Sequence, residues 1–447
     1  MNSTPKDLAK FVFSKLKRAK TGARQPPLAV LTTLFENLFF TSLQTEEGQL
    51  IKVTVTLLDA ENPDPNPPRK KVAHRWTCVP FGERIPFTVK NLVKLSKAAD
   101  PWSTSLAVDY DAHNELFIWG LIDQAYHYRS FINYESTFSP EQPGLFRTAI
   151  NDIGNLHVML DYELIANLKH NVLISNYVDV FASGPVRALL GQHSTDYQAA
   201  VRQHFTDELG SDVLDDWSGY LNNVISRSLC RILLKMQDYQ HGGAFLITPD
   251  TETGLSIKHH LSYGRLFRAI VQFVKFDIAS FTHTETIMNE YIDLEQNTLP
   301  SHLYLQENVA ATDKSETSDE LKGAIMFVAA LSCIDGLVVL SPDLEVRGFG
   351  VVIRSVKAPD LVYVATQATV DERKLLPVSP SHYGTRHRSM FAYCWNHAGS
   401  LGFVVSQDGD IRAITRVGDK LIMWENIKVQ QFIKSKRLFR PHQHQGV

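Results

Sequence analysis

The chain has 447 residues, 44% of them hydrophobic and 21% charged, which is the ordinary balance of a globular protein with two or three domains. Lysine and arginine (45) nearly balance aspartate and glutamate (48), and the net charge of −3 argues against a general nucleic-acid or membrane-surface binder. The four cysteines are far apart in the chain, so neither a disulfide framework nor a zinc site is indicated and a cytoplasmic location is expected. They are Cys78, Cys230, Cys333 and Cys394.

Residues 1–25 are expected to form an amphipathic N-terminal segment. Apolar side chains recur there at helical spacing among lysines, at Leu8, Phe11, Val12 and Leu16. The segment lacks the continuous apolar stretch of a secretory signal, and packing on the following domain is favoured over a membrane-surface role. The longest apolar run, 28–40, is interrupted by Glu36 and Asn37 and is too short to cross a bilayer, so no membrane span is expected.

Residues 26–210 are expected to form an α+β domain. The pattern predicts a helix from 26 to 40, and then a strand at 53–57 in which apolar and polar residues alternate. Strands at 75–81 and 116–122 flank a helix at 89–99, and a proline-rich loop covers 62–68. From 156 to 190 the pattern alternates between strand-like and helical without clear boundaries.

Residues 211–436 are expected to form a second domain, followed by a tail at 437–447. An apolar stripe at helical spacing predicts a long helix over 212–236, and a further helix is predicted at 263–276. The polar stretch 307–319 is predicted to be a surface loop. Short apolar strands then alternate with helices, which indicates a mixed β-sheet flanked by helices and, for the whole chain, a mixed α/β or α+β fold.

A cluster of cations precedes the helical pattern of 390–398. It reads Gly384-Thr385-Arg386-His387-Arg388-Ser389. Guanidinium groups match phosphate oxygens bidentately, and the first turn of a helix adds unpaired backbone N–H groups and the positive end of the dipole. The motif therefore predicts a phosphate site in the first turn of a helix, with a solvated cationic cap as the alternative.

A carboxylate and a glycine, Asp335 and Gly336, stand where a helical pattern gives way to the apolar strand 337–340. An aspartate in this position can hold a divalent cation or accept a proton, and the glycine lets a ligand approach the backbone, although Asp-Gly is also common in simple turns. Neither Gly-x-x-x-x-Gly-Lys-Ser/Thr nor Gly-x-Gly-x-x-Gly occurs, so a nucleotide would be held by other means.

Together these two motifs resemble the Asp-Gly-Ala and Arg-His-Arg motifs of the diadenylate cyclase domain family, whose members condense two ATP into cyclic di-AMP. Three further segments are similar to strands of that family in the same order. They are 241–247, with its Gly-Gly-Ala opening, 348–353 after the Asp-Gly motif, and 401–411 at the close. The resemblance covers roughly the last half of the chain.

The resemblance implies a role for each matching residue. Asp335 would bind Mg²⁺ or Mn²⁺ and lie near the attacking ribose 3′-hydroxyl, while Arg386, His387 and Arg388 complete the catalytic set. Thr385, Arg386, His387 and Arg388 would grip the triphosphate of ATP. Gly336 and Leu337 would line the nucleotide, with Val352 or Ile353 at the adenine. The ATP-binding residues would also include Gly384, Ser389 and Ser406. His387 or Asp408 could instead face the metal.

The chain departs from the family pattern at two positions. Leu337 replaces the alanine of Asp-Gly-Ala, and Gln407 stands where the family often has a glutamate that can approach the metal. These changes leave open an alternative, a nucleotide-binding regulatory protein without turnover.

The resemblance also implies an assembly and a regulator. Each subunit would hold one ATP, so activity would require a homodimer, or a higher homo-oligomer, with two sites face to face. Because sensor domains are found fused to this catalytic domain, the N-terminal half is expected to sense an unidentified ligand and regulate the cyclase.

Overall fold

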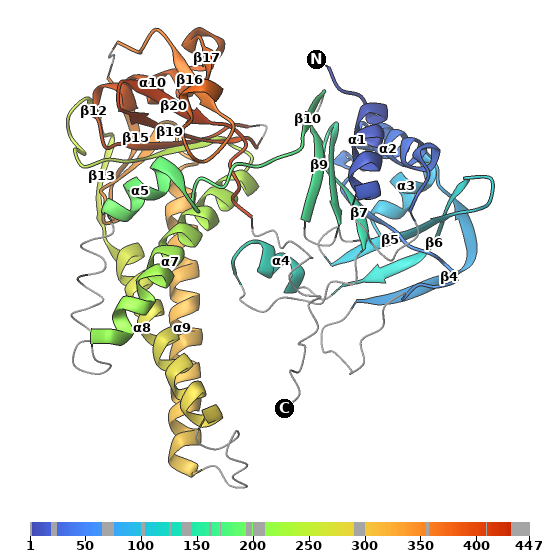
Figure 1. The fold of residues 1–447 in the computed structure, drawn as a ribbon, viewed down its shortest axis with the longest axis horizontal. Helices are drawn as coiled ribbons and strands as arrows, with labels where there is room; N and C mark the ends of the chain where they lie inside the picture. Colours follow the sequence, from blue (N-terminus) through green and yellow to red (C-terminus); the bar gives the residue numbers. More distant parts are fainter. Residues whose placement is uncertain are drawn as a thin grey trace. The chain divides into compact units, whose positions relative to one another are not determined.

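The computed structural model describes residues 2–18, 25–64, 76–99, 103–124, 127–135, 145–160, 163–169, 171–193, 199, 211–289, 300–354, 357–407 and 409–430. Its contacts divide the chain into an N-terminal unit, Met1–Tyr177 with Gln430–Val447, and a C-terminal unit, Val178–Val429. Both units combine helices with β-sheet, and the mixed α/β fold expected from the sequence is confirmed (Figure 1).

The N-terminal unit is an α+β fold built on one large sheet. Its helices are α1 (Pro5–Arg18), α2 (Leu28–Ser42), α3 (Val89–Ser96) and α4 (His127–Ile132). Its strands are β1 (Thr45–Glu46), β2 (Gln49–Leu50), β3 (Val53–Leu57), β4 (Thr77–Pro86), β5 (Thr104–Tyr110), β6 (Leu116–Asp123), β7 (Phe146–Asp152), β8 (Asn155–Leu160), β9 (Glu163–Lys169) and β10 (Val172–Ile174). The large sheet has the order β10-β9-β8-β7-β3-β5-β6-β4, and β1 pairs with β2 in a separate hairpin.

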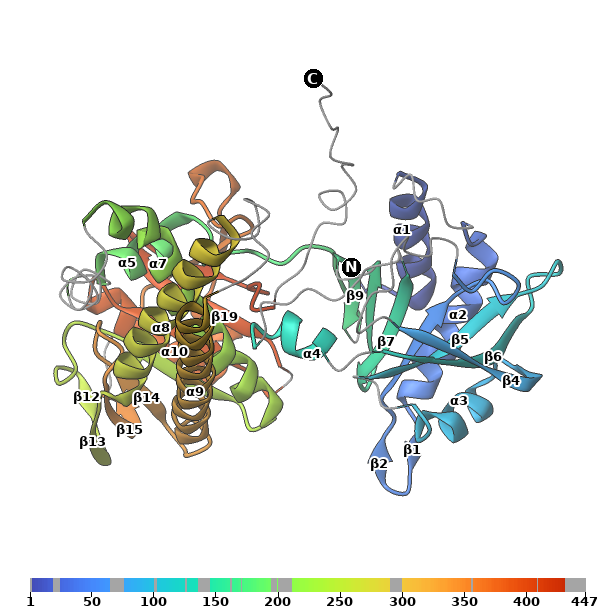
Figure 2. The same cartoon turned by 90° about the horizontal axis from the view of Figure 1, so that it is seen from below.

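One face of this sheet carries the main core of the N-terminal unit. Val53 and Val55 of β3 point to this face and pack with the buried stripes of α1 and α2. The N-terminal amphipathic helix therefore packs on its own domain, with Leu8 and Val12 fully buried. Figure 2 shows α1, α2 and α3 on this side, whereas α4 lies across the sheet from them.

The C-terminal unit also combines helices with strands. Its helices are α5 (Gly184–His193), α7 (Ser211–Asp238), α8 (Arg265–Ile287), α9 (Ser301–Leu331) and α10 (Thr385–Asn396), with short 3-10 turns η2 (Glu372–Lys374) and η3 (Pro380–His382). Its strands are β11 (Gly243–Ile247), β12 (Leu255–Ser256), β13 (His259–Tyr263), β14 (Leu337–Leu340), β15 (Val346–Ile353), β16 (Val362–Ala365), β17 (Leu376–Val378), β18 (Leu401–Val405), β19 (Ile411–Val417) and β20 (Lys420–Trp424).

The sheet of this unit follows the order β12-β15-β14-β11-β18-β19-β20-β16-β17, with β13 also paired to β15. Strands β11, β14 and β18 are buried throughout, as their continuous apolar sequences require. On one face α10 packs Met390 and Phe391 against Ala244 and Leu246 of β11. On the other face, Phe403 stacks on Phe181 and contacts Phe245 in a tilted arrangement. Figure 1 shows α5 and α7 on this side.

The two units divide between Tyr177 and Val178, whereas the sequence pattern predicts a boundary between 210 and 211. The segment before α5 is tied to the C-terminal unit by backbone hydrogen bonds. Val178 N–H donates to Asn426 O over 3.0 Å, and Lys428 N–H donates to Val178 O over 2.8 Å. The predicted tail, 437–447, lies outside the described residues.

The predicted surface loop at 307–319 is wrong, because this stretch lies inside α9. Its hydroxyl and amide side chains do not compete with the helix. Thr312 Oγ1 donates to Asn308 O over 2.8 Å, and Thr317 Oγ1 donates to Asp313 O over 2.8 Å, so both bond back within the helix. Pairing with α8 adds an ion pair between Lys314 and Asp277. The polar residues of 307–319 do not indicate a loop, because α9 buries only one stripe of its surface.

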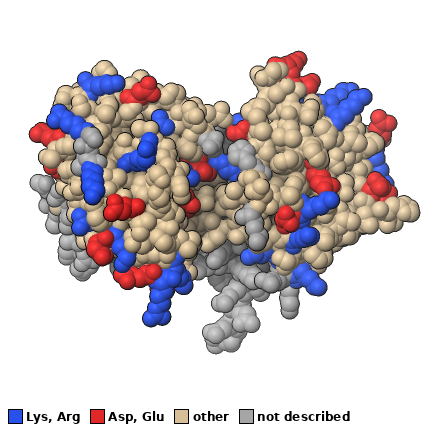
Figure 3. Space-filling view, turned by 90° about the horizontal axis from the view of Figure 1, so that it is seen from above, with Lys and Arg blue, Asp and Glu red and all other residues tan. Residues whose placement is uncertain are grey.

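Charges of both signs occur on the part of the surface that Figure 3 shows. On the face shown in Figure 3, Lys and Arg are interspersed with Asp and Glu. None of the helices in the described part of the chain combines the length and apolarity that crossing a membrane requires.

The assignment of 307–319 to α9 predicts how the helix responds to proline. Thr312→Pro places proline in the helix interior and should lower the free energy of unfolding by about 3 kcal/mol or more. Ser301→Pro changes the first residue of the same helix, where proline is tolerated, and should have little effect. Urea denaturation followed by circular dichroism measures both. If the two variants have the same free energy of unfolding, residue 312 does not lie in the interior of a helix.

Candidate functional site

The pairing register of the central strands brings the separate motifs to one edge of the C-terminal sheet. Strand β11 runs parallel to β14, with Phe245 opposite Val338, and antiparallel to β18, with Gly243 opposite Val405. The residues before β11, the residues before β14 and the residues after β18 therefore lie at the same edge. Leu337 pairs with Val351 across the β14–β15 hairpin, so the end of β15 reaches this edge as well.

Asp335 and Gly336 form the turn between α9 and β14. Gly336 has φ +119°, and a Cβ atom there would lie 2.6 Å from the carbonyl carbon of Gly350 and 2.8 Å from Val351 N. Only glycine fits this contact with β15. The tight turn fixes the backbone of Asp335, whose side chain is exposed. Asp335 is thus an accessible carboxylate on a constrained backbone.

The basic motif occupies the first turn of α10, as the sequence predicts. The helix begins at Thr385, and its N-cap, Gly384, provides no side-chain acceptor. The first N–H groups of the helix therefore have no acceptor within it and face outward with the positive end of the dipole. Thr385 and Arg388 are exposed and Arg386 is half-buried, so backbone and side-chain donors are gathered at one helix end.

The guanidinium of Arg386 joins α10 to the edge of the sheet. A Cβ atom at Gly242, just before β11, would lie 2.9 Å from Arg386 Nη1 and 3.2 Å from the backbone N of Gln407. Gly242 has φ +68°. The missing side chain at Gly242 therefore makes room for Arg386 beside the end of β18. Three segments that resemble the cyclase motifs meet at this point.

His387 is a neutral imidazole whose orientation is fixed. Arg412 Nη1, from β19, lies 3.2 Å from His387 Nε2. A guanidinium only donates, so Nε2 accepts and the ring proton resides on Nδ1. Burial, together with the charges of Arg412 and Arg386, lowers the pKa of His387 to about 4. With Nε2 engaged by Arg412, the ring is better placed to orient the first turn of α10 than to face a metal.

Arg412 itself is a residue that sequence reasoning missed. Besides His387, it contacts Asp410 Oδ2 and Glu425 Oε1, each over 3.3 Å, and its guanidinium lies 5.9 Å from the ring centroid of Tyr383. Tyr383 in turn donates to Glu425 over 3.4 Å. No local motif marks Arg412, because only the pairing of β19 with β18 brings it under α10. Through His387, these contacts of Arg412 support the first turn of α10, which carries the basic motif.

The remaining predicted site residues differ in how far their side chains are exposed. Leu337 is only 6% exposed and belongs to the core cluster, so its side chain packs inward. Val352 is 49% exposed, while Ile353 is half-buried. Ser406 Oγ accepts from Asp410 N–H over 3.0 Å and closes the turn after β18. The bulkier residue in place of alanine is thus accommodated by the core.

Metal ligands converge little in this region. Among the described residues, no group of three or more His, Cys, Asp or Glu side chains could hold a metal ion. Asp408, an expected alternative ligand, lies outside the described residues. A cation at Asp335 would therefore take its other ligands from phosphate and water, which is the usual arrangement for Mg²⁺ at a nucleotide.

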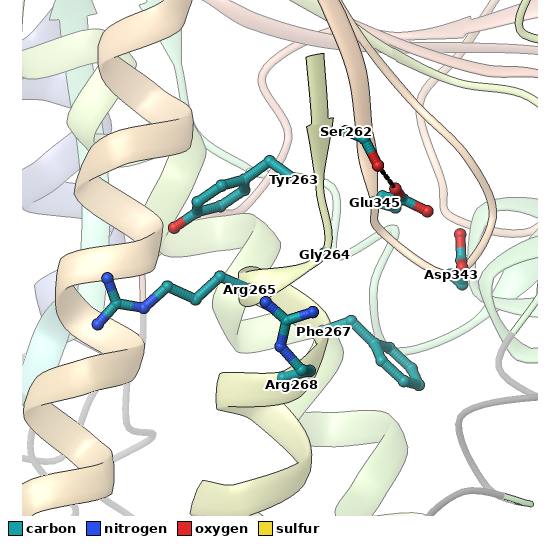
Figure 4. A pocket seen from close by; sticks show the side chains of 8 residues that line it. All are labelled: Ser262, Tyr263, Gly264, Arg265, Phe267, Arg268, Asp343 and Glu345. Atoms are coloured by element: carbon teal, nitrogen blue, oxygen red, sulfur yellow. Dashed lines mark hydrogen bonds between the residues drawn. The ribbon is translucent and has the colours of Figure 1, made fainter.

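A separate pocket of about 420 Å³ lies at the other end of the β14–β15 hairpin, between β13 and the start of α8 (Figure 4). Its acidic groups are engaged locally, since Glu345 accepts from Ser262 and pairs with Arg347. Arg265 extends to Glu320 of α9 over 3.2 Å. These pairings join β13 to the hairpin and α8 to α9. The pocket shares no residue with the predicted nucleotide site.

The Arg412 network predicts a specific change in the titration of His387. Arg412→Met removes the repulsion from the guanidinium, and the pKa of His387 should rise from about 4 toward 6.5. Arg416→Met removes an arginine from the same strand that lies over Trp395 instead, and should leave the His387 titration unchanged. Histidine NMR titration measures both variants. If the pKa of His387 is unchanged in the Arg412 variant, the charge of Arg412 does not lower it.

Comparison with known proteins bears on the N-terminal unit. No curated protein and no solved structure matches the chain. Residues 20–123 match the model of a family described as "Probable sensor domain DACNV". This match supports the sensor domain that the sequence analysis expects in the N-terminal half.

Proposed function

We propose that the C-terminal unit is a diadenylate cyclase, which condenses two ATP into cyclic di-AMP, and that the N-terminal sensor domain regulates it. The observation that carries the proposal is the meeting of Arg386 with Gly242 and Gln407 at the edge of the sheet where Asp335 also lies. Three distant segments that resemble the cyclase motifs contribute to this one edge.

The first turn of α10 suits the triphosphate. Arg386 and Arg388 supply two positive charges, and the uncapped N-terminus adds backbone donors. The neutral His387 adds no charge of its own, and instead holds Arg412 against the helix. Exposed Val352, at the end of β15, offers an apolar surface to the adenine.

Asp335 supplies the opposite charge that phosphoryl transfer requires near the nucleophile. Its exposed carboxylate would hold Mg²⁺ or Mn²⁺ or accept the proton of the ribose 3′-hydroxyl. Held by Asp335, a divalent cation would supply positive charge that offsets the charge of the transferred phosphoryl group. The protein's own task is then to position two nucleotides.

The chemistry implies two subunits. Each 3′-oxygen attacks the α-phosphate of the other ATP, so two ester bonds form and two diphosphates leave. One site of this kind holds one nucleotide, and therefore two copies of the chain must present the Asp335 and Arg386 edges to each other.

The alternative is a nucleotide-binding regulator without turnover. Gln407 favours it, because a neutral amide replaces a carboxylate that could approach the metal. ATP binding without product would distinguish this alternative from the cyclase.

Incubation of the full chain with ATP and Mg²⁺ or Mn²⁺, followed by chromatography, should yield cyclic di-AMP. Asp335→Asn should lower the rate by about 10²–10⁴-fold, because the variant lacks the carboxylate that holds the metal or accepts the proton. Asp343→Asn makes the same change at the far end of the β14–β15 hairpin and should retain activity. Equal loss in both variants, or no product from the wild type with either metal, would contradict the cyclase.

The requirement for two facing sites predicts a dependence on protein concentration. If the dimer dissociates on dilution, the rate per subunit should fall, and a non-reacting ATP analogue should favour the dimer by mass action. Light scattering and product formation across the same dilution series measure both. A rate per subunit that stays constant where light scattering reports monomers would exclude the face-to-face mechanism.

A further inference from the structure

A histidine lies beside the turn that carries Asp335. The two residues meet at Gly350 of β15, which has φ +61°. A Cβ atom at Gly350 would lie 3.3 Å from His259 Cδ2 and 3.6 Å from Asp335 O. Because glycine lacks this atom, the imidazole of His259 can approach the backbone of β15 next to the Asp335 turn. His259 comes from β13, outside the segments that carry the Asp-Gly and basic motifs.

His259 forms a stacked pair with Phe349. The two residues are directly opposite each other in the antiparallel pairing of β13 with β15. Their ring centroids are 4.7 Å apart, and the planes of the rings differ by 23°. This spacing is that of an aromatic stack, which fixes the plane of the imidazole relative to the sheet. The ring is therefore oriented before any ligand binds.

One face of the His259 ring is open. The residue is exposed, whereas Phe349, on which it stacks, is only partly exposed. Within the described part of the chain, the His259 side chain has no second ring contact, no hydrogen bond and no ion pair. A flat ring that is held on one face and open on the other is suited to stack on a nucleobase.

The order of the strands places this ring where the base of a nucleotide would lie. Arg386 Nη1 lies beside Gly242, which precedes β11, and β15 is two strands from β11 in the sheet. Neighbouring strands are about 4.8 Å apart, so the phosphate end and the ring are about 10 Å apart across the sheet. A nucleotide extends over a comparable distance from its phosphates to its base.

The strand between them carries Asp335 at its start. Strand β14 lies between β11 and β15, and Asp335 and Gly336 immediately precede it. Phosphates near β11 and a base near β15 would therefore place the sugar near Asp335. This order agrees with the proposed role of Asp335 next to the ribose 3′-hydroxyl.

We propose that the stacked pair of His259 and Phe349 is the platform for the nucleobase, and that the base stacks on the open face of His259. Val352, two residues beyond Gly350, is 49% exposed and adds apolar surface in the same part of β15. Stacking acts through the π face that every base has, so the platform contributes affinity for the nucleoside and not the choice between bases.

The test is isothermal titration calorimetry of the full chain with two ligands in the presence of Mg²⁺. One is 3′-deoxy-ATP, which lacks the attacking hydroxyl, and the other is inorganic triphosphate, which lacks the nucleoside. His259→Ala should weaken the binding of 3′-deoxy-ATP about 5- to 100-fold, because one base stack is lost, and should leave the binding of triphosphate unchanged. Unchanged binding of 3′-deoxy-ATP, or an equal loss for both ligands, would overturn the platform.

Two further variants separate stacking from other effects of the change. His259→Phe keeps a flat ring and should bind 3′-deoxy-ATP nearly as the wild type does. His260→Ala alters the next residue of β13, which is also exposed but points to the other side of the strand, and should have no effect. If His259→Phe loses as much affinity as His259→Ala, or if His260→Ala loses as much, stacking on His259 does not bind the base.

The inference rests on the proposed nucleotide site at α10 but not on turnover, and a variant of Arg386 distinguishes their failures. Arg386→Gln should weaken the binding of both ligands, because both carry the triphosphate. If it does so while His259→Ala weakens neither, the nucleotide site stands and the platform is wrong. If the wild type binds neither ligand, the nucleotide site and the platform are both wrong.

Discussion

The register between β11 and its two neighbours is the constraint on which the candidate site depends. Because β14 is parallel to β11 and β18 is antiparallel, the start of two strands and the end of the third fall at one edge. A slip of one residue would move every side chain to the other face of the sheet. The apolar layers on both faces of β11, with Phe245 on one side and Leu246 on the other, oppose any slip.

The charges around that edge follow from its packing. Arg386 lies over Gly242, and Arg412 lies beneath His387, which stays neutral because burial and both arginines disfavour its cation. Asp410 and Glu425 offset the charge of Arg412. The net effect is a positive helix end that is held in place by compensated charges, next to an exposed Asp335. Such an arrangement suits an anionic ligand with a cation between the two.

Patterning predicts much of this chain. The long helix predicted over 212–236 is confirmed as α7, and the basic motif does lie in the first turn of α10. Apolar residues at helical spacing made both helices predictable. The error at 307–319 came from polar residues that bond back to their own helix. The contact of Arg412 with His387 could not be predicted, because it depends on the pairing of β19 with β18, which no local motif indicates. Local periodicity indicates elements, whereas the partners of each strand decide which side chains meet.

The most direct test is a crystal structure of the chain with Mn²⁺ and 3′-deoxy-ATP, which lacks the attacking hydroxyl and so cannot react. We expect triphosphate density at the first turn of α10, within hydrogen-bond distance of Arg386 or Arg388, and an anomalous Mn²⁺ peak at Asp335. Nucleotide bound elsewhere, or at α10 with Mn²⁺ remote from Asp335, would contradict it.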